Sequence, residues 1–201
     1  MSKKAKIIAG SVTGGVIVVA GIVVLLIFLV FIPAGQRAVL DAKYNEAIQL
    51  MENGPYDDLY LNYDDAMKIF IEIHNDSYDV KDDIIECHYL MGVDALNDGN
   101  GRLTYAIQHF TEVGNYKDAP ELLKEAYYQD GWYQLESKEY NNAHDSFEQV
   151  AKYNYKNSKE AMNKASEMSS MYMYTVYRPH DCGPYDAAVA ELPKYIKENK
   201  Q

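Results

Sequence analysis

The sequence has little cysteine, and it has none of the residue spacings that common metal sites use. Two cysteines in 201 residues, Cys87 and Cys182, are too few for a disulfide-stabilised scaffold. One bridge between them or two free thiols both fit this count. The five histidines form no H-E-x-x-H motif, and no paired C-x-x-C occurs. We therefore expect no bound metal and no cofactor.

Groups of polar residues that would carry out catalysis are also missing. The acidic clusters lack the alternating oxygen ligands, central glycine and closing glutamate of a calcium loop. Asp64 and Asp65 are better explained as the amino-terminal cap of a helix, whose dipole they complement. Cys87 and His88 are adjacent, and neighbours on a helix point about 100° apart, so adjacency alone does not make them nucleophile and base. The sequence predicts a protein that is not an enzyme.

Basic residues are in the minority everywhere except at the amino terminus. The chain has 19 lysines and arginines against 30 aspartates and glutamates. Lys3, Lys4 and Lys6 precede the uncharged run over residues 7–32, and the first acid is Asp41, so the residues after the run carry 16 basic and 30 acidic side chains. Such an acidic surface repels nucleic acid and anionic lipid headgroups. Nucleic-acid binding is therefore excluded as a function.

A long run without charge follows the amino-terminal lysines. Residues 7–32 contain no charged side chain, and a helix of this length exceeds the roughly 20 residues that span a bilayer. A secretory signal has an apolar core of about 7–15 residues, so this run is too long to be one. It predicts an uncleaved transmembrane anchor that ends at Pro33. Gly10, Gly14 and Gly21 share one face of this helix and would let it pack closely against a second helix.

The charges on either side of the anchor predict its orientation. Residues 1–6 form a basic head, whereas Arg37 and Lys43 on the other side are accompanied by Asp41. The positive-inside rule places the amino terminus in the cytoplasm and residues 33–201 outside it. We therefore expect a single-pass protein of the cell membrane with an extracytoplasmic domain.

Residues 33–201 contain a spacing that is typical of packed helix pairs. Gly131 and Ala143 are twelve residues apart, and Phe147 follows four residues later. The glycine removes a side chain where a second helix crosses closely, and the alanine does the same on that second helix. The phenylalanine lies one turn further along the same face and fills the space beyond the crossing. The pattern predicts a helical hairpin.

The same spacing recurs along the chain in two parallel series. The alanine series is Ala66, Ala106, Ala143 and Ala188, and the series four residues later is Phe70, Phe110, Phe147 and Leu192. Tyr89 and Gly92 match Tyr128 and Gly131 at an offset of 39 residues, whereas Ala47 stands in place of the glycine in the first unit. The repeat predicts three to four hairpins. Their approximate bounds are 36–78, 79–116, 117–155 and 156–201.

The first and last units are the least regular. In the first, we expect helices over residues 36–52 and 63–74 with a turn at Asn53-Gly54-Pro55 between them. In the last, residues 178–184 are expected to form a loop, and Pro193 is expected to disturb the helix that follows.

Together these features resemble the tetratricopeptide-like repeats of bacterial proteins with a single membrane anchor. The resemblance covers about residues 36–168 and includes the linker Tyr116-Lys117-Asp118-Ala119, which is similar to Tyr155-Lys156-Asn157-Ser158. It implies an all-α fold with one amino-terminal transmembrane helix and an α-solenoid of three to four hairpins. It also implies a curved scaffold that binds a protein or peptide partner at the cell envelope without chemistry of its own.

Aromatic side chains on the first helix of each hairpin are candidates for a binding groove, because in this family those helices line the concave face. The candidate residues are Tyr128, Trp132, Tyr133, Tyr172 and Tyr174. The other interpretation is that these rings fill the core or cover the end of the array.

Two further functions fit the same sequence. A self-associating subunit of a membrane oligomer or filament would assemble through Gly10 and Gly14 in the anchor. A receptor for a cell-wall glycan would use Trp132 and the tyrosines near it. Each function depends on a different surface of the protein.

Overall fold

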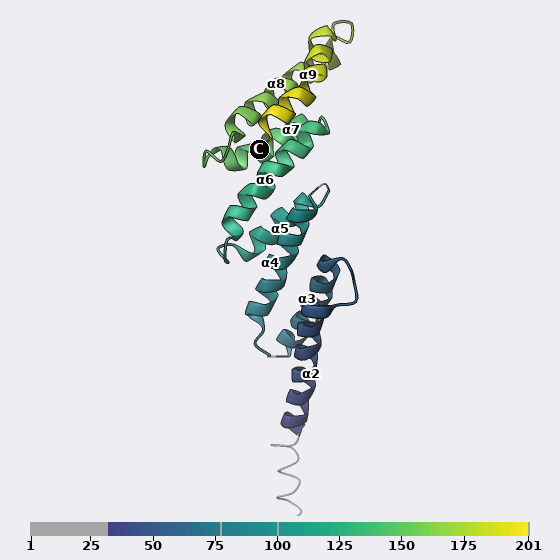
Figure 1. Cartoon of the computed structure of the whole chain (residues 1–201), viewed down its shortest axis with the longest axis vertical. Helices are drawn as coiled ribbons and strands as arrows, with labels where there is room; N and C mark the ends of the chain where they lie inside the picture. Colours follow the sequence, from purple (N-terminus) through teal and green to yellow (C-terminus); the bar gives the residue numbers. More distant parts are fainter. Residues whose placement is uncertain (1–31, 77, 100, 201) are drawn as a thin grey trace, which may run out of the picture.

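The computed structural model describes residues 32–76, 78–99 and 101–200. Over these residues it contains eight α-helices and no strand, which confirms an all-α fold. The helices are α2 (Ile32–Asn53), α3 (Leu59–Asn75), α4 (Lys81–Asp98), α5 (Leu103–Val113), α6 (Ala119–Glu136), α7 (Tyr140–Ala151), α8 (Ser158–Tyr177) and α9 (Gly183–Asn199). Figure 1 shows them following one another along the long axis of the molecule, an arrangement that fits an α-solenoid.

The predicted anchor, residues 7–32, lies outside the described residues except for Ile32, and so do residues 1–6 and the glycines of the anchor. No helix within the described ranges combines the length and the apolar composition needed to cross a bilayer. Pro33, where the anchor was predicted to end, is the second residue of α2 as described, and a proline is tolerated in the first turn of a helix. The predicted end of the anchor stays a prediction, because the residues before Ile32 lie outside the described ranges.

The close crossings expected at the glycines are present in the second and third hairpins. A Cβ atom added at Gly131 would lie 2.7 Å from the ring of Phe147, and one added at Gly92 would lie 2.8 Å from the ring of Phe110. Both distances are shorter than normal carbon contacts. Each phenylalanine ring therefore occupies the space that the missing side chain leaves free.

The first hairpin reaches the same packing without glycine. Ala47 of α2 is fully buried in one cluster with Ala66 and Phe70 of α3. Helix α3 begins four residues before its predicted start, at Leu59. The prediction that Asp64 and Asp65 cap this helix was wrong, because both lie inside α3. The cap is Asp58, whose carboxylate accepts a hydrogen bond from the backbone N–H of Tyr60 at 3.0 Å.

Tyrosine hydroxyls fasten each hairpin to the next one. In each linker a tyrosine donates to an acid on the first helix of the preceding hairpin, and we call these three contacts the linker clasps. They join Tyr78 to Asp41 at 2.8 Å, Tyr116 to Glu86 at 2.7 Å and Tyr155 to Glu125 at 2.6 Å. Three residues after each acid a second tyrosine donates forward to the next hairpin. These bonds join Tyr44 to Asp83, Tyr89 to Asp118 and Tyr128 to Asn157.

Two lysines reinforce the second and third clasps. The ammonium groups of Lys117 and Lys156 lie 2.6 and 2.8 Å from the carboxylates of Glu86 and Glu125. Each ammonium also lies over the ring of the forward-donating tyrosine. Both lysines have positive φ angles, 47° and 46°, which L-residues adopt infrequently. The clasps therefore hold the linker in a bend that the backbone alone would disfavour.

Helix α9 packs differently from the other second helices. It contacts α8 and also reaches back to α6, so its carboxyl end lies beside α6 in Figure 1. The ring of Trp132 on α6 lies 5.2 Å from the ring of Phe147 on α7 and 6.1 Å from that of Tyr195 on α9. Trp132 is thus enclosed between α7 and α9. The last helix covers the first helices of two hairpins instead of completing a regular fourth hairpin.

Pro193 does not interrupt α9, contrary to the expectation from sequence. The proline lies on the exposed side of the helix, between the buried residues Leu192 and Ile196. There the backbone carbonyl that loses its partner is able to turn toward water, which lowers the cost of the proline.

Candidate binding surfaces

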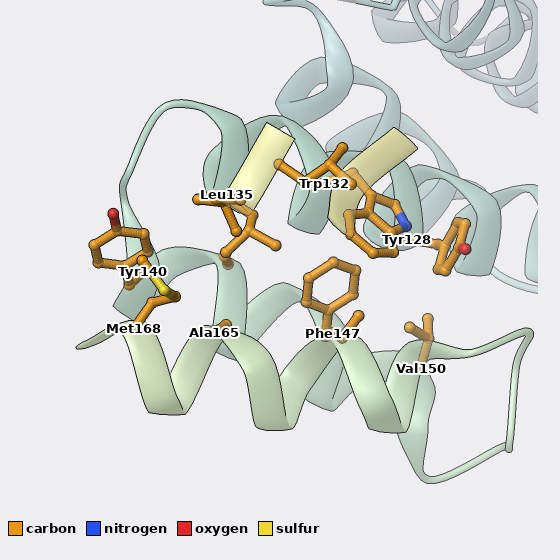
Figure 2. Packing of buried hydrophobic residues seen from close by; sticks show 12 residues of the cluster. Tyr128, Trp132, Leu135, Tyr140, Phe147, Val150, Ala165 and Met168 are labelled. Atoms are coloured by element: carbon orange, nitrogen blue, oxygen red, sulfur yellow. The ribbon is translucent and has the colours of Figure 1, made fainter. Parts of the chain in front are cut away.

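The two aromatic residues expected to lead the groove lie in the core. Trp132 has no exposed surface, and Tyr128 is 1% exposed. Their rings are 6.0 Å apart in an edge-to-face arrangement, and Figure 2 shows Trp132 and Phe147 pointing toward one another. For these two residues the packing interpretation replaces the groove interpretation, because a fully enclosed ring offers no surface to a partner.

The other three candidate residues lie at the surface but do not form one groove. Tyr133 is 37% exposed on α6, and Tyr172 and Tyr174 are 48% and 43% exposed near the end of α8. Tyr172 and Tyr174 are two residues apart on one helix, so they point to different sides. The ring of Tyr172 packs against Tyr185 at the start of α9. This part of the surface is better explained as the junction between α8 and α9.

An open cleft of about 520 Å³ lies between α5, α6 and α7. Phe110 of α5, Leu123 and Tyr127 of α6 and Val150 of α7 supply its apolar part. The turn that joins α5 to α6 contributes Gly114, which ends α5 with a positive φ of 59°. The cleft therefore sits where two second helices flank one first helix.

Two lysines and a tyrosine border this cleft. The ammonium groups of Lys124 and Lys152 each lie 5.2 Å from the centre of the Tyr153 ring. Lys124 is also paired with Glu121 at 2.6 Å. Among the described residues none that lines the cleft is acidic, although the whole chain has a net charge of −11. The cleft is a basic site with an apolar floor in an otherwise acidic protein.

Sequence reasoning missed the cleft because its residues come from three helices and two turns. The only signal that could have found it is charge, since Lys124 and the pair Lys152-Tyr153 stand out in an acidic domain. Their proximity depends on how α6 and α7 cross, which the sequence does not fix to within one residue.

Three polar side chains from three helices form a partly buried chain of hydrogen bonds. The Nδ1 atoms of His88 on α4 and His109 on α5 are 2.9 Å apart, and Nε2 of His109 is 2.9 Å from the hydroxyl of Tyr60 on α3. Burial, with a smaller contribution from His88, lowers the pKa of His109 to about 4. Burial also lowers the pKa of His88. Both imidazoles are therefore neutral near pH 7, and the network ties the first hairpin to the second.

The two cysteines are free, so of the two alternatives the unbridged one holds in the structure. Cys87 is buried in the cluster of α2, α3 and α4, and burial raises the pKa of its thiol to about 12. At neutral pH it is therefore unreactive. Cys182 lies in the linker between α8 and α9 and is partly exposed.

One group of potential metal ligands occurs within the described part of the chain. Ligand atoms of His144, Asp145 and Glu148 lie within 4.8 Å of one another. All three project from α7, and the two carboxylates are exposed. Exposed clusters of this kind are common without a metal, so the group supports no assignment.

No protein-family model, curated protein or solved structure matches the chain. The resemblance to tetratricopeptide-like repeats thus stays a prediction from the residues themselves. The function is inferred from the surfaces described above.

Proposed function

We propose that the chain is a membrane-anchored, non-enzymatic scaffold whose extracytoplasmic domain binds a protein or peptide partner at the cell envelope. The observation that carries this proposal is the basic, apolar-floored cleft between α5, α6 and α7. The uncharged run over residues 7–32 supports the anchor, and the lysines of residues 1–6 support the orientation.

The chemistry of the cleft describes the segment that fits it. An apolar or aromatic side chain would leave water by packing on the partly exposed Pro120, Leu123 and Tyr127. Carboxylates next to it would approach Lys124 and Lys152, the only charged groups among the described lining residues. The partner segment therefore combines an apolar anchor with at least one acid.

Site-specific photo-cross-linking tests this proposal in the cell. Tyr153, which is 59% exposed at the cleft, is replaced by a photoreactive phenylalanine analogue, and Tyr105, 51% exposed on α5 away from the cleft, serves as the matched control. We expect one dominant adduct with a foreign protein from position 153 and none from position 105. Equal adducts from both positions would contradict the proposal. An adduct of the chain with itself would favour the self-associating subunit instead.

Charge reversal tests the chemistry of the partner. The double change Lys124→Glu and Lys152→Glu should reduce the adduct at position 153 at least tenfold, because it places acids opposite acids. Lys159→Glu with Lys194→Glu alters the net charge equally at exposed positions outside the cleft. An equal loss in both double variants would show that only the overall charge of the protein matters.

Cysteine labelling tests the topology. Treating intact cells with a membrane-impermeant maleimide should label Cys182, because the repeat domain is proposed to lie outside the cytoplasm. Buried Cys87 should react only after denaturation, which makes it an internal control. Labelling of Cys182 only after the cells are lysed would place the domain in the cytoplasm and overturn the orientation.

A further inference from the structure

Helix α9 covers a surface that faces away from α7. Both helices contact α6 and α8, and Trp132 lies between them with Phe147 on one side and Tyr195 on the other. At its far end α9 is held by polar contacts, since the side-chain amide of Asn157 donates to the backbone carbonyl of Asn199 at 2.8 Å. We call the surface of α6 and α8 under α9 the α9 site. It is separate from the cleft between α5, α6 and α7.

Helix α9 buries few residues in the α9 site for a helix of its length. Leu192 and Ile196 are the only fully buried residues of its 17, and Tyr185, Ala188, Val189 and Tyr195 are partly buried against the same cluster, whereas α7 buries six of 12. The linker before α9 is mostly exposed over residues 178–182. Helix α9 is therefore less deeply buried than α7, although it belongs to the same core cluster.

One polar group at the α9 site is unsatisfied. The indole N–H of Trp132 is buried and has no hydrogen-bond acceptor among the described residues. A buried donor without a partner is unfavourable relative to one that reaches water or an acceptor. A helix that supplies an acceptor to this N–H would remove the disadvantage.

We propose that the α9 site is a receptor surface for an amphipathic helix of a partner protein, and that α9 is its resident and displaceable occupant. The partner helix has the chemistry of α9: branched aliphatic residues four apart, as at Leu192 and Ile196, and an aromatic ring beside them, as at Tyr195. Docking exchanges one helix for another over Trp132. This surface lies beyond the proposed function of the cleft, and neither depends on the other.

The single tryptophan provides a direct readout of the exchange, because Trp132 is the only indole in the chain. The full-length protein in detergent is compared with a release variant that carries Leu192→Asp and Ile196→Asp. We expect the release variant to keep the helical circular dichroism of α2 to α8 and to shift the emission of Trp132 to longer wavelength as water reaches the ring.

The probe is a synthetic peptide of residues 183–200. Added to the release variant, it should return the emission to shorter wavelength in a saturable way. It should bind the unaltered protein about tenfold or more weakly, because the tethered α9 competes at high effective concentration. A control peptide with the same two aspartates should not bind either protein.

Three outcomes would overturn the proposal. In the first, the release variant loses helix signal beyond α9, so α9 is an integral part of the fold. In the second, the emission of the release variant does not change, so α9 does not depend on these two side chains. In the third, the peptide fails to bind a release variant whose emission has shifted, so the exposed site does not accept a helix in trans.

Discussion

Two glycines decide how closely the helices of the middle hairpins approach. At Gly92 and Gly131 there is no room for a methyl group, because the rings of Phe110 and Phe147 lie where it would be. This much follows from sequence, since only a residue without a side chain suits such a crossing. Whether Trp132 is buried does not follow from sequence. An aromatic residue fits a buried seam or an exposed groove, and the position of α9 decides between them.

Replacing Gly131 by alanine should therefore destabilise the protein. The added Cβ atom would meet the Phe147 ring at 2.7 Å, and overpacking of this kind costs about 1–3 kcal/mol. Gly35→Ala is the control, because nothing lies within 4 Å of its Cβ position. It should be neutral or stabilise by up to about 1 kcal/mol. Urea unfolding measures both, and equal stability of the two variants would contradict the close crossing.

The buried histidine pair should make stability depend on pH. The pKa of His109 is about 4 in the folded protein, below the usual value near 6.5, so the unfolded chain binds more protons between these values. The free energy of unfolding should fall as pH drops from 6.5 toward 4. Asp64 on α3 and Glu112 on α5 moderate this loss, because their charges favour the protonated form of His109.

A loss of about 2 kcal/mol is expected over this pH range, less than the full shift implies because the network lies near the surface. Urea titrations at several pH values measure it. The variant His109→Gln should flatten this dependence, whereas a change at exposed His180 should not. An unaltered slope in His109→Gln would show that other groups carry the effect.

At the scale of the element, the linker clasps explain why the chain uses so much tyrosine. Each clasp requires an acid, a tyrosine three residues later and a second tyrosine in the linker, and this set occurs three times. The sequence reveals the recurring linker but not its target, since an acid on a helix usually faces solvent. Helix α8 has Lys164 and Glu167 where α6 has Glu125 and Tyr128, so no further hairpin is clasped there.

The fourth unit also packs less regularly than the others. Ala188 and Leu192 have the spacing of a regular second helix, and Leu192 is buried as expected. The spacing does not specify which side of α8 the helix covers. Trp132 and Tyr128 offer an apolar surface on α6, and α9 packs over it together with α8.

Removing the tyrosine hydroxyl of a linker clasp should lower the free energy of unfolding. Tyr116→Phe and Tyr155→Phe each leave a carboxylate with one donor fewer, and we expect a loss of about 1 kcal/mol for each. The joints are formed by different residues, so the double variant should show the sum to within about 0.5 kcal/mol. Tyr105→Phe, at an exposed position, is the control. A double variant no weaker than either single one would contradict independent joints.

At the scale of the whole molecule, almost every contact joins helices that are neighbours in the chain. The exceptions are contacts between successive first helices and the return of α9 to α6. Such a protein behaves as a row of coupled units, in which stability is the sum of each unit and its contacts with its neighbours. A destabilising substitution should therefore affect its own hairpin and the adjacent one more than distant hairpins.

Phe70→Ala tests this property. Removing the buried ring should destabilise the first hairpin by about 3–5 kcal/mol. Hydrogen exchange should become faster in α2 and α3. The amides of α6 to α8 should keep their protection, and the emission wavelength of Trp132 should not change. Phe147→Ala is the matched change in the third hairpin. It should raise hydrogen exchange in α6 and α7 and leave that of α2 and α3 unchanged. Uniform loss of protection in both variants would indicate one cooperative unit.

The linker clasps also determine how such a chain can lengthen. Residues 117–155 begin with the lysine and aspartate that follow one clasp tyrosine and end with the tyrosine of the next. A tandem copy of this segment would present the same polar partners at both of its ends as the original. Duplication within the coding sequence would then lengthen the array by one hairpin, with every polar joint already in place.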